Sequence, residues 1–267
     1  MGNIFVRLDR LLVDRGLIDS RQRAQALILA AKVLVDGQRV TKAGQRVSTD
    51  SRLEVVGEDH PFVSRGGLKL QHAIETFGLE VGGLVGMDVG ASTGGFTDCL
   101  LQYGAQKVYA VDVGYGQLAW KLRQDARVVV LERQNIRHLS RDQISEPIQI
   151  VTLDTSFISL KLVIPAVMPF FDPGTDSGFR TQGCFPSQGK LVALIKPQFE
   201  AGRAFVGKGG VVRDPEVHRA VCDSILEFCQ TLGLLVIGII PSPILGPKGN
   251  VEFLLFATYE QPYPNVR

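Results

Sequence analysis

The fold of this 267-residue chain is decided by residues 88–98, which read Asp-Val-Gly-Ala-Ser-Thr-Gly-Gly-Phe-Thr-Asp. An apolar run at 84–87 precedes them, and a second apolar run at 108–111 ends at Asp112. A strand, a glycine-rich turn, a helix and a second strand ending in a carboxylate form half of a nucleotide-binding unit, because glycines permit a tight turn and close approach of a ligand. Asp112 is placed to accept hydrogen bonds from ribose hydroxyl groups.

The spacing of the glycines narrows the choice of nucleotide. A dinucleotide-binding turn has the pattern G-x-G-x-x-G, which lets a pyrophosphate sit on the N-terminus of the following helix. Here the pattern is G-x-x-x-G-G after Asp88, and it resembles the S-adenosylmethionine loop of class I methyltransferases. The spacing disfavours a nicotinamide oxidoreductase. A glycine-rich turn of an arbitrary α/β protein is the plainer alternative, and Asp112 at the expected place argues against it.

Strands and helices alternate through the rest of the chain. We expect strands at 84–89, 107–112, 127–131, 149–154, 190–196, 234–240 and 251–258, and helices from about 64 to 77 and at 95–103, 116–124, 159–168 and 215–231. This alternation predicts an α/β fold with a doubly wound, mostly parallel sheet. The segment 241–250 is too short for a crossover helix, so the last two strands should pair antiparallel. Residues 172–188, rich in Gly, Pro, Ser and Thr, are interpreted as a loop or insertion.

The first 56 residues form a separate pattern. Leu8, Leu11 and Leu12 predict a short amphipathic helix, and Asp19 or Ser20 can cap a second helix. An Asp-Gly turn at 36–37 predicts a hairpin, and 50–56 supplies another strand. Residues 1–56 contain ten basic and six acidic side chains, whereas acids are in slight excess in the remainder. A small basic module on a near-neutral body indicates docking of a polyanion.

This module resembles the S4 RNA-binding domain over residues 5–56. The resemblance implies that basic side chains of the second helix and the hairpin contact RNA phosphates. The candidate RNA-binding residues are Arg7, Arg10, Arg21, Arg23, Lys32, Arg39 and Arg65. A solvated helix face of mixed charge is the alternative. We expect the S4-like domain at 1–57, a linker at 58–64 and the α/β domain at 65–267.

Four charged residues fall where the ligand crevice of such a sheet should lie. Lys69 is on the helix before the first strand, Asp154 and Lys196 end strands, and Glu252 begins the last strand. Active sites of open α/β sheets lie at the carboxyl ends of parallel strands. A buried lysine beside another cation favours the neutral amine, which can accept the proton of a hydroxyl group. The alternative is that Lys196 and Glu252 form only a structural ion pair.

Nearly the whole chain resembles the TlyA family, hemolysin-like S4-domain proteins that methylate ribosomal RNA, with the segment 172–188 and the end of the chain as departures. The motifs that carry the resemblance are Val-Ser-Arg-Gly-Gly-Leu-Lys at 63–69, the stretch 88–97, Asp-Val-Gly-Tyr-Gly-Gln-Leu-Ala-Trp at 112–120, Asp-Thr-Ser-Phe-Ile-Ser-Leu at 154–160, Lys-Pro-Gln-Phe-Glu at 196–200, Gly-Gly-Val-Val at 209–212, Asp-Pro at 214–215 and Gly-Asn-Val-Glu at 249–252. The resemblance implies a class I methyltransferase domain, similar to FtsJ, after the S4 domain. It implies S-adenosylmethionine as methyl donor and cytidine 2′-hydroxyl groups of 23S and 16S rRNA as acceptors, with no metal.

The resemblance also assigns residues. It implies a catalytic tetrad of Lys69, Asp154, Lys196 and Glu252. The residues implied for the methyl donor are Asp88, Gly90, Ala91, Ser92, Thr93, Gly94, Gly95, Phe96, Asp112, Val113, Asn135 and Ile136.

This chain lacks the sequence motifs that are typical of several other classes of protein. The run after the fourth strand is Asp-Thr-Ser-Phe rather than the Asn/Asp-Pro-Pro-Tyr/Phe of amine methyltransferases, and no cysteine ends a strand as C5 methylation requires. A pore-forming hemolysin needs membrane-spanning elements, and no apolar run is long enough. An RNA-binding protein without catalysis is disfavoured because the whole tetrad is present. Four cysteines without C-x-x-C spacing and the absence of a signal peptide pattern predict a cytoplasmic protein.

Overall fold

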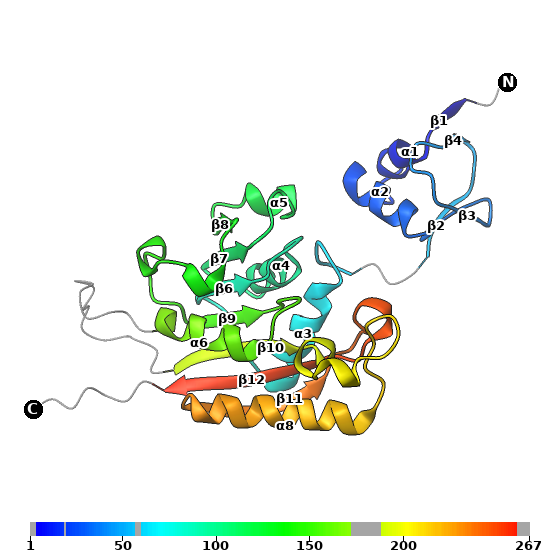
Figure 1. Cartoon of the computed structure of the whole chain (residues 1–267). Helices are drawn as coiled ribbons and strands as arrows, with labels where there is room; N and C mark the ends of the chain where they lie inside the picture. The colour runs from blue at the N-terminus through cyan, green and yellow to red at the C-terminus, as the bar shows by residue number, and fades with distance from the viewer. Residues whose placement is uncertain (1–3, 19, 57–59, 172–187, 261–267) are drawn as a thin grey trace, which may run out of the picture. The chain divides into compact units, whose positions relative to one another are not determined.

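The computed structural model describes residues 4–18, 20–56, 60–171 and 188–260, which form two compact units, Met1–Asp59 and His60–Arg267 (Figure 1). Asp19, one of the two expected helix caps, lies outside the described residues, and so does the expected insertion apart from Gln188. Each unit is described by itself.

Within residues 4–18 and 20–56, the N-terminal unit contains two helices and five short strands. These are β1 (Phe5–Arg7), α1 (Leu8–Asp14), α2 (Arg21–Leu29), β2 (Val33–Val35), β3 (Gln38–Val40), β4 (Arg46–Ser48) and β5 (Leu53–Val55). β3, β2 and β5 form one antiparallel sheet, and β1 pairs with β4. The pairing of β1 with β4 was not expected from the sequence, because the two strands lie far apart in the chain and no hairpin turn joins them as one joins β2 to β3.

Local chemistry explains the expected elements of this unit. Leu8, Leu12 and Ile28 are completely buried and join the two helices in one core. The hydroxyl group of Ser20 accepts a hydrogen bond from the backbone N–H of Arg23 at 3.3 Å, so Ser20 caps α2. At the hairpin tip, Asp36 and Gly37 have φ angles of 51° and 80°, the left-handed conformation that a tight β2–β3 turn requires.

The C-terminal unit is built on a seven-stranded sheet. Its strands are β6 (Val85–Val89), β7 (Lys107–Asp112), β8 (Val128–Glu132), β9 (Ile150–Leu153), β10 (Gln188–Ile195), β11 (Leu234–Pro241) and β12 (Phe253–Glu260). The order is β11-β12-β10-β9-β6-β7-β8, and β12 is antiparallel to both of its neighbours. The other neighbouring pairs are parallel. The predicted α/β fold, a doubly wound sheet with an antiparallel last strand, is therefore confirmed.

Helices cover both faces of this sheet (Figure 1). They are α3 (Gly66–Phe77), α4 (Gly95–Gln102), α5 (Trp120–Arg123), α6 (Leu160–Phe171), α7 (Pro197–Glu200), α8 (Pro215–Thr231) and the 3₁₀ turns η1 (Ile136–His138), η2 (Arg141–Gln143), η3 (Arg203–Phe205) and η4 (Pro247–Gly249). Adjacent strand residues alternate between the two cores: Ile150 packs with α3 and α4, and Val151 packs with α6 and α8. The helix expected at 116–124 is only α5, because Gly116 (φ 73°) and the extended Ala119 precede it.

Candidate active site

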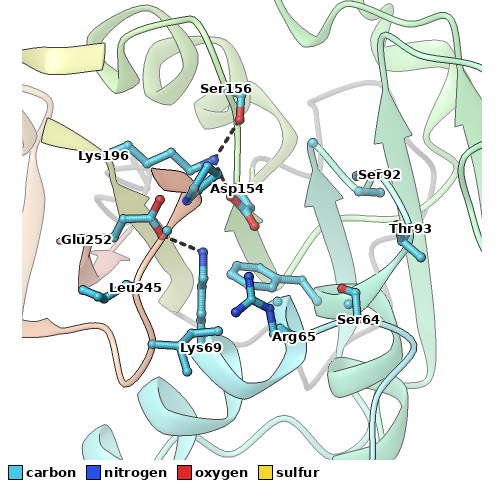
Figure 2. Close-up of a pocket in the computed structure, with 18 residues that line it drawn as sticks. Ser64, Arg65, Lys69, Ser92, Thr93, Asp154, Ser156, Lys196, Leu245 and Glu252 are labelled. Atoms are coloured by element: carbon cyan, nitrogen blue, oxygen red, sulfur yellow. Dashed lines mark hydrogen bonds and ion pairs between the residues drawn. The ribbon is translucent and has the colours of Figure 1, made fainter. Parts of the chain in front are cut away.

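A pocket of about 410 Å³ opens at the carboxyl ends of the parallel strands, where the sheet order reverses between β6 and β9. Its walls are the start of α3, the β6–α4 loop, the ends of β9 and β10, and the chain just before β12 (Figure 2). Lys69, Asp154, Lys196 and Glu252 all line it. Side chains separated by up to 183 positions in the chain thus meet in one place.

The two lysines of the pocket each pair with a different carboxylate. The Nζ atom of Lys69 lies 2.6 Å from Oε2 of Glu252, and the Nζ atom of Lys196 lies 2.6 Å from Oδ1 of Asp154. Lys196 also donates a hydrogen bond to the hydroxyl oxygen of Ser156 at 3.0 Å. The alternative expectation of a structural Lys196–Glu252 pair is therefore wrong, since Glu252 is taken by the lysine of α3.

One carboxylate oxygen in this pocket is left without a partner. Glu252 is 1% exposed, and its Oε1 atom is buried with no hydrogen-bond donor among the described residues. A buried acceptor without a donor costs free energy, so the pocket favours a ligand that brings a hydroxyl or N–H group to this atom. Gly246 permits the arrangement, because a Cβ atom there would collide with the same oxygen.

The glycines of the β6–α4 loop are required because neighbouring parts of the chain pack closely against them. A Cβ atom on Gly90 would lie 2.7 Å from the carbonyl oxygen of Asp154. On Gly94, which has a φ of 99°, it would overlap Leu122, and on Gly95 it would overlap the hydroxyl oxygen of Ser64. The same glycines therefore let α3 and β9 approach the loop, with Ala91, Ser92, Thr93 and Phe96 lining the pocket between them.

Asp88, expected at the methyl donor, lies beneath the loop and not on the pocket wall. It is completely buried and accepts hydrogen bonds from the backbone N–H and hydroxyl group of Thr97, at 2.9 and 2.7 Å, and from the hydroxyl group of Thr152 at 3.2 Å. Burial raises the pKa of Asp88 to about 7. Its visible role is to tie the first turn of α4 to β6 and β9.

The other residues expected around the methyl donor lie beyond the pocket wall. Oδ2 of Asp112 accepts the backbone N–H of Ser92 at 2.7 Å, and Oδ1 accepts that of Gly114 at 2.7 Å, so Asp112 braces the loop from behind. Val113 is 72% exposed. Asn135 caps η1, its Oδ1 accepting the N–H of Arg137, and the side chain of Ile136 is buried in the core.

Sequence reasoning missed three contributors to the site. Ser64 and Ser156 line the pocket beside Gly95 and Lys196, and the turn 244–247 forms the wall next to Glu252. Both serines lie inside conspicuous motifs, so their sequence context was a usable signal. The turn 244–247 has no charged residue or motif to mark it.

The expected RNA-binding residues of the N-terminal unit have unequal surroundings. Arg7 and Arg21 both bind the completely buried Asp9, at 2.9 and 3.0 Å. Arg10 pairs with Asp14 at 3.4 Å on the surface, and Arg39 donates to a backbone carbonyl. Arg23 and Lys32 lie on and just after α2, and Arg65 lines the pocket of the C-terminal unit. Asp9 was not singled out from the sequence.

Two further properties bear on the class of protein. No group of three or more His, Cys, Asp and Glu side chains within 4–18, 20–56, 60–171 and 188–260 is arranged to hold a metal ion. No helix in the described part of the chain has the length and apolar character that crossing a bilayer requires.

The sheet order, the antiparallel last strand and the glycine-walled pocket define the methyltransferase class of α/β folds. Comparison with protein families agrees: residues 62–259 match the FtsJ-like methyltransferase family and residues 6–53 match the S4 domain. The chain belongs to the FtsJ-like methyltransferases, in the TlyA group that joins this domain to an S4 domain.

Three relatives illustrate the similarity. The 16S/23S rRNA (cytidine-2′-O)-methyltransferase TlyA of Mycobacterium tuberculosis is 45% identical over 251 residues, which are 94% of this chain and 88% of that protein. Hemolysin A of Brachyspira hyodysenteriae is 39% identical over 250 residues, 93% of this chain and 98% of that protein. A solved structure named as a hemolysin, from Streptococcus thermophilus, has a TM-score of 0.71 and 39% identity and covers 99% of this chain and 92% of its own.

Proposed function

We propose that this protein transfers a methyl group from S-adenosylmethionine to the 2′-hydroxyl of cytidine in ribosomal RNA, in the large subunit and, as a second target, the small one. The observation that carries the proposal is the convergence of two lysine–carboxylate pairs on one pocket, with Oε1 of Glu252 left as an unpaired acceptor. The relative from Mycobacterium tuberculosis has this activity by name, which supports the same substrate class.

The residues of the β6–α4 loop fit a methyl donor with no phosphate. The loop presents Ser92, Thr93 and Gly95 to the pocket at the start of α4, and Arg65 lines the same pocket. The carboxylate of Asp112 lies directly behind the loop, where the hydroxyl groups of a ribose could donate to it in addition to the backbone N–H groups of Ser92 and Gly114. S-Adenosylmethionine, when bound there, supplies an electrophilic methyl group on a sulfonium.

The charged residues of the pocket have distinct tasks in this proposal. The Nζ atom of Lys196 accepts the proton of the attacking hydroxyl group in this proposal. Asp154 and Ser156 hold that nitrogen in place. Oε1 of Glu252 accepts a hydrogen bond from a donor group that the substrate brings into the pocket, and Lys69 fixes the Glu252 carboxylate through its other oxygen. Alignment of the hydroxyl oxygen with the methyl group supplies much of the acceleration.

The S4 unit supports RNA as the bearer of the hydroxyl group. Basic side chains of this unit, among them Arg23 and Lys32, would contact phosphates, which position a substrate without specifying its sequence. The proposed domain boundaries are 1–57 for RNA docking and 65–267 for methyl transfer, with 58–64 as the linker. A ribosomal substrate implies that the protein works in the cytoplasm.

The test is to map 2′-O-methyl groups on 16S and 23S rRNA from cells with and without the gene, and to repeat the transfer with the purified full-length chain and S-adenosylmethionine. We expect a cytidine mark that depends on the gene and that the purified chain restores. An unchanged map together with no transfer in vitro would overturn the proposal. Lysis of erythrocytes by the same preparation, without methyl transfer, would favour the pore-forming activity that the name hemolysin suggests.

A further inference from the structure

Two loops of the C-terminal unit carry positive charge and no acid. Residues 203–213 include Arg203, Lys208 and Arg213, and residues 241–250 include Lys248. All four side chains are exposed, and within the described residues none of them forms an ion pair or hydrogen bond. We call residues 203–213 and 241–250 the basic loop pair. The first loop contains the motif Gly-Gly-Val-Val at 209–212, to which the proposed chemistry gives no role.

Asn250 joins the two loops. Its side chain is 3% exposed, and Oδ1 accepts the backbone N–H of Val212 at 3.1 Å. Its Nδ2 donates to the carbonyl oxygen of Gly210 at 3.0 Å and to that of Pro247 at 3.1 Å. Because both carbonyl oxygens contact one nitrogen, the turn that carries Lys208 lies directly beside the turn that carries Lys248.

The backbone of both turns is held in a conformation that needs support. Lys248 has a φ of 58°, and Gly209 and Gly210 have φ angles of 84° and 81°. A lysine in the left-handed region persists only where the surroundings determine its backbone, and Asn250 contributes to that constraint through its hydrogen bond to the carbonyl oxygen of Pro247. The first turn is also closed by an isolated bridge between Gly207 and Val211.

The basic loop pair borders the candidate active site. Gly246 and Pro247, which precede Lys248, line the pocket, and Glu252 follows Asn250 by two residues. Arg65 on the pocket wall adds a further cation without a carboxylate partner in the described part of the chain. The rim of the pocket on this side therefore carries positive charge, and neither loop contains an acidic residue. Such a rim is complementary in charge to a run of phosphates.

We propose that the basic loop pair binds the phosphate backbone of the RNA next to the target nucleotide, with Lys208 and Lys248 as contacts and Asn250 as the residue that positions them. This inference rests on the proposed function and adds to it a second RNA-binding surface outside the S4 unit. In this proposal the basic loop pair holds the acceptor ribose over the pocket. It therefore raises the affinity for RNA and leaves the affinity for the methyl donor unchanged.

The test compares two double variants of the full-length chain that remove the same charge. The variant Lys208→Ala/Lys248→Ala removes two positive charges from the basic loop pair. Arg127→Ala/Lys190→Ala is the control, because both residues stand at the amino ends of their strands, β8 and β10, at the opposite edge of the sheet. For each we would measure the affinity for 23S rRNA between low and high salt, the kcat and KM of methyl transfer, and the affinity for S-adenosylmethionine by calorimetry.

The expected result is a rise in KM for RNA of about tenfold, with a salt slope smaller by about one for each lysine lost. Affinity for S-adenosylmethionine and kcat should equal the control values, because neither lysine lines the pocket. The same KM and salt slope as in the control would overturn the inference. If the wild type binds rRNA but transfers no methyl group, the proposed function fails, and the salt slopes still decide whether this surface binds RNA.

A second comparison tests the role of Asn250. Asn250→Ala should raise KM for RNA and lower the salt slope in the same direction as the double lysine variant. Adding Asn250→Ala to Lys208→Ala/Lys248→Ala should then change KM little further, because all three substitutions disable one surface. Fully additive effects on KM, or a lowered melting temperature with unchanged KM and salt slope, would show that Asn250 only supports the fold.

Discussion

Asp9 in the N-terminal unit and Asp88 in the C-terminal unit are both completely buried aspartates with opposite surroundings. The carboxylate of Asp9 accepts from Arg7, Arg21 and Gln25, and the hydrogen bond from Arg7 is the main cause that holds its pKa below the usual range. Asp88 accepts from two threonines and no cation, and burial raises its pKa to about 7. The first is stabilised as an anion, and the second favours a proton.

A third arrangement occurs in the pocket. Glu252 is as deeply buried as either aspartate and has a cationic partner, yet one of its oxygens remains unpaired. The comparison teaches that burial of charge alone does not mark a functional residue. Asp9 is paired within its own unit, whereas Oε1 of Glu252 has no donor in the described part of the chain and is available to a ligand.

The largest effect is expected for a pocket lysine. Lys196→Ala should lower kcat by about 10²–10⁴-fold, equal to about 3–5 kcal/mol, because it removes the proposed proton acceptor. Lys190→Ala is the matched control, since Lys190 lies at the other end of β10 and donates only to a backbone carbonyl of Glu80. Single-turnover methyl transfer measures both. A Lys196→Ala variant that keeps control-level activity would rule out this residue as the base.

The next effect concerns the pH dependence of the C-terminal unit. In the unfolded chain Asp88 titrates near 4, so between pH 4 and about 7 the folded state binds more protons. Stability should therefore fall as pH rises through this window, by on the order of 4 kcal/mol, and be flat above it for this group. Urea unfolding of the wild type and of Asp88→Asn at several pH values isolates this slope as their difference.

If Asp88→Asn does not fold, the titration of this carboxyl group in the wild type can be followed by NMR of carbon-labelled aspartate. A midpoint at or below 4 would contradict the comparison with Asp9, because both buried aspartates would then favour the anion.

The effect at Asp9 should be smaller and of opposite sign. Its lowered pKa contributes stability above about pH 4 that is lost as pH falls further. Asp9→Ala should cost the N-terminal unit about 1–3 kcal/mol, since the half-exposed arginines that lose their partner can turn to water. Proteolysis at the N-terminal unit should increase while calorimetric binding of S-adenosylmethionine stays at the wild-type value. Loss of that binding would show that Asp9 supports both units.

The smallest effect on the free energy of unfolding is expected when an ion pair that lies fully on the surface is removed. Arg10 and Asp14 form an exposed pair four residues apart on α1. Arg10→Ala should change the free energy of unfolding by no more than about 0.5 kcal/mol. The affinity of the Arg10→Ala variant for rRNA should weaken if Arg10 is a phosphate contact as expected, and a filter-binding assay measures this effect separately from the effect on stability.

Local sequence patterns were sufficient to predict most of the helices and strands of the fold. Apolar runs that alternate with helical segments located all seven strands of the large sheet, and the short 241–250 connection predicted the antiparallel last strand. Patterns failed where a structure depends on partners far away in the chain. β1 and β4 exist only because they pair with each other, and α5 is short because the preceding turn folds against the loop at Thr93.

By itself, the sequence determined the sheet, the position of the glycine loop and the four charged residues at its edge, because strand periodicity and chain order place these within a few residues. Only the tertiary structure decided that Lys69 takes Glu252 and Lys196 takes Asp154, that Oε1 of Glu252 is left without a donor, and that Asn250 ties two distant loops together. These depend on the directions of side chains brought together across the fold, and no local pattern encodes which of two nearby lysines reaches a given carboxylate.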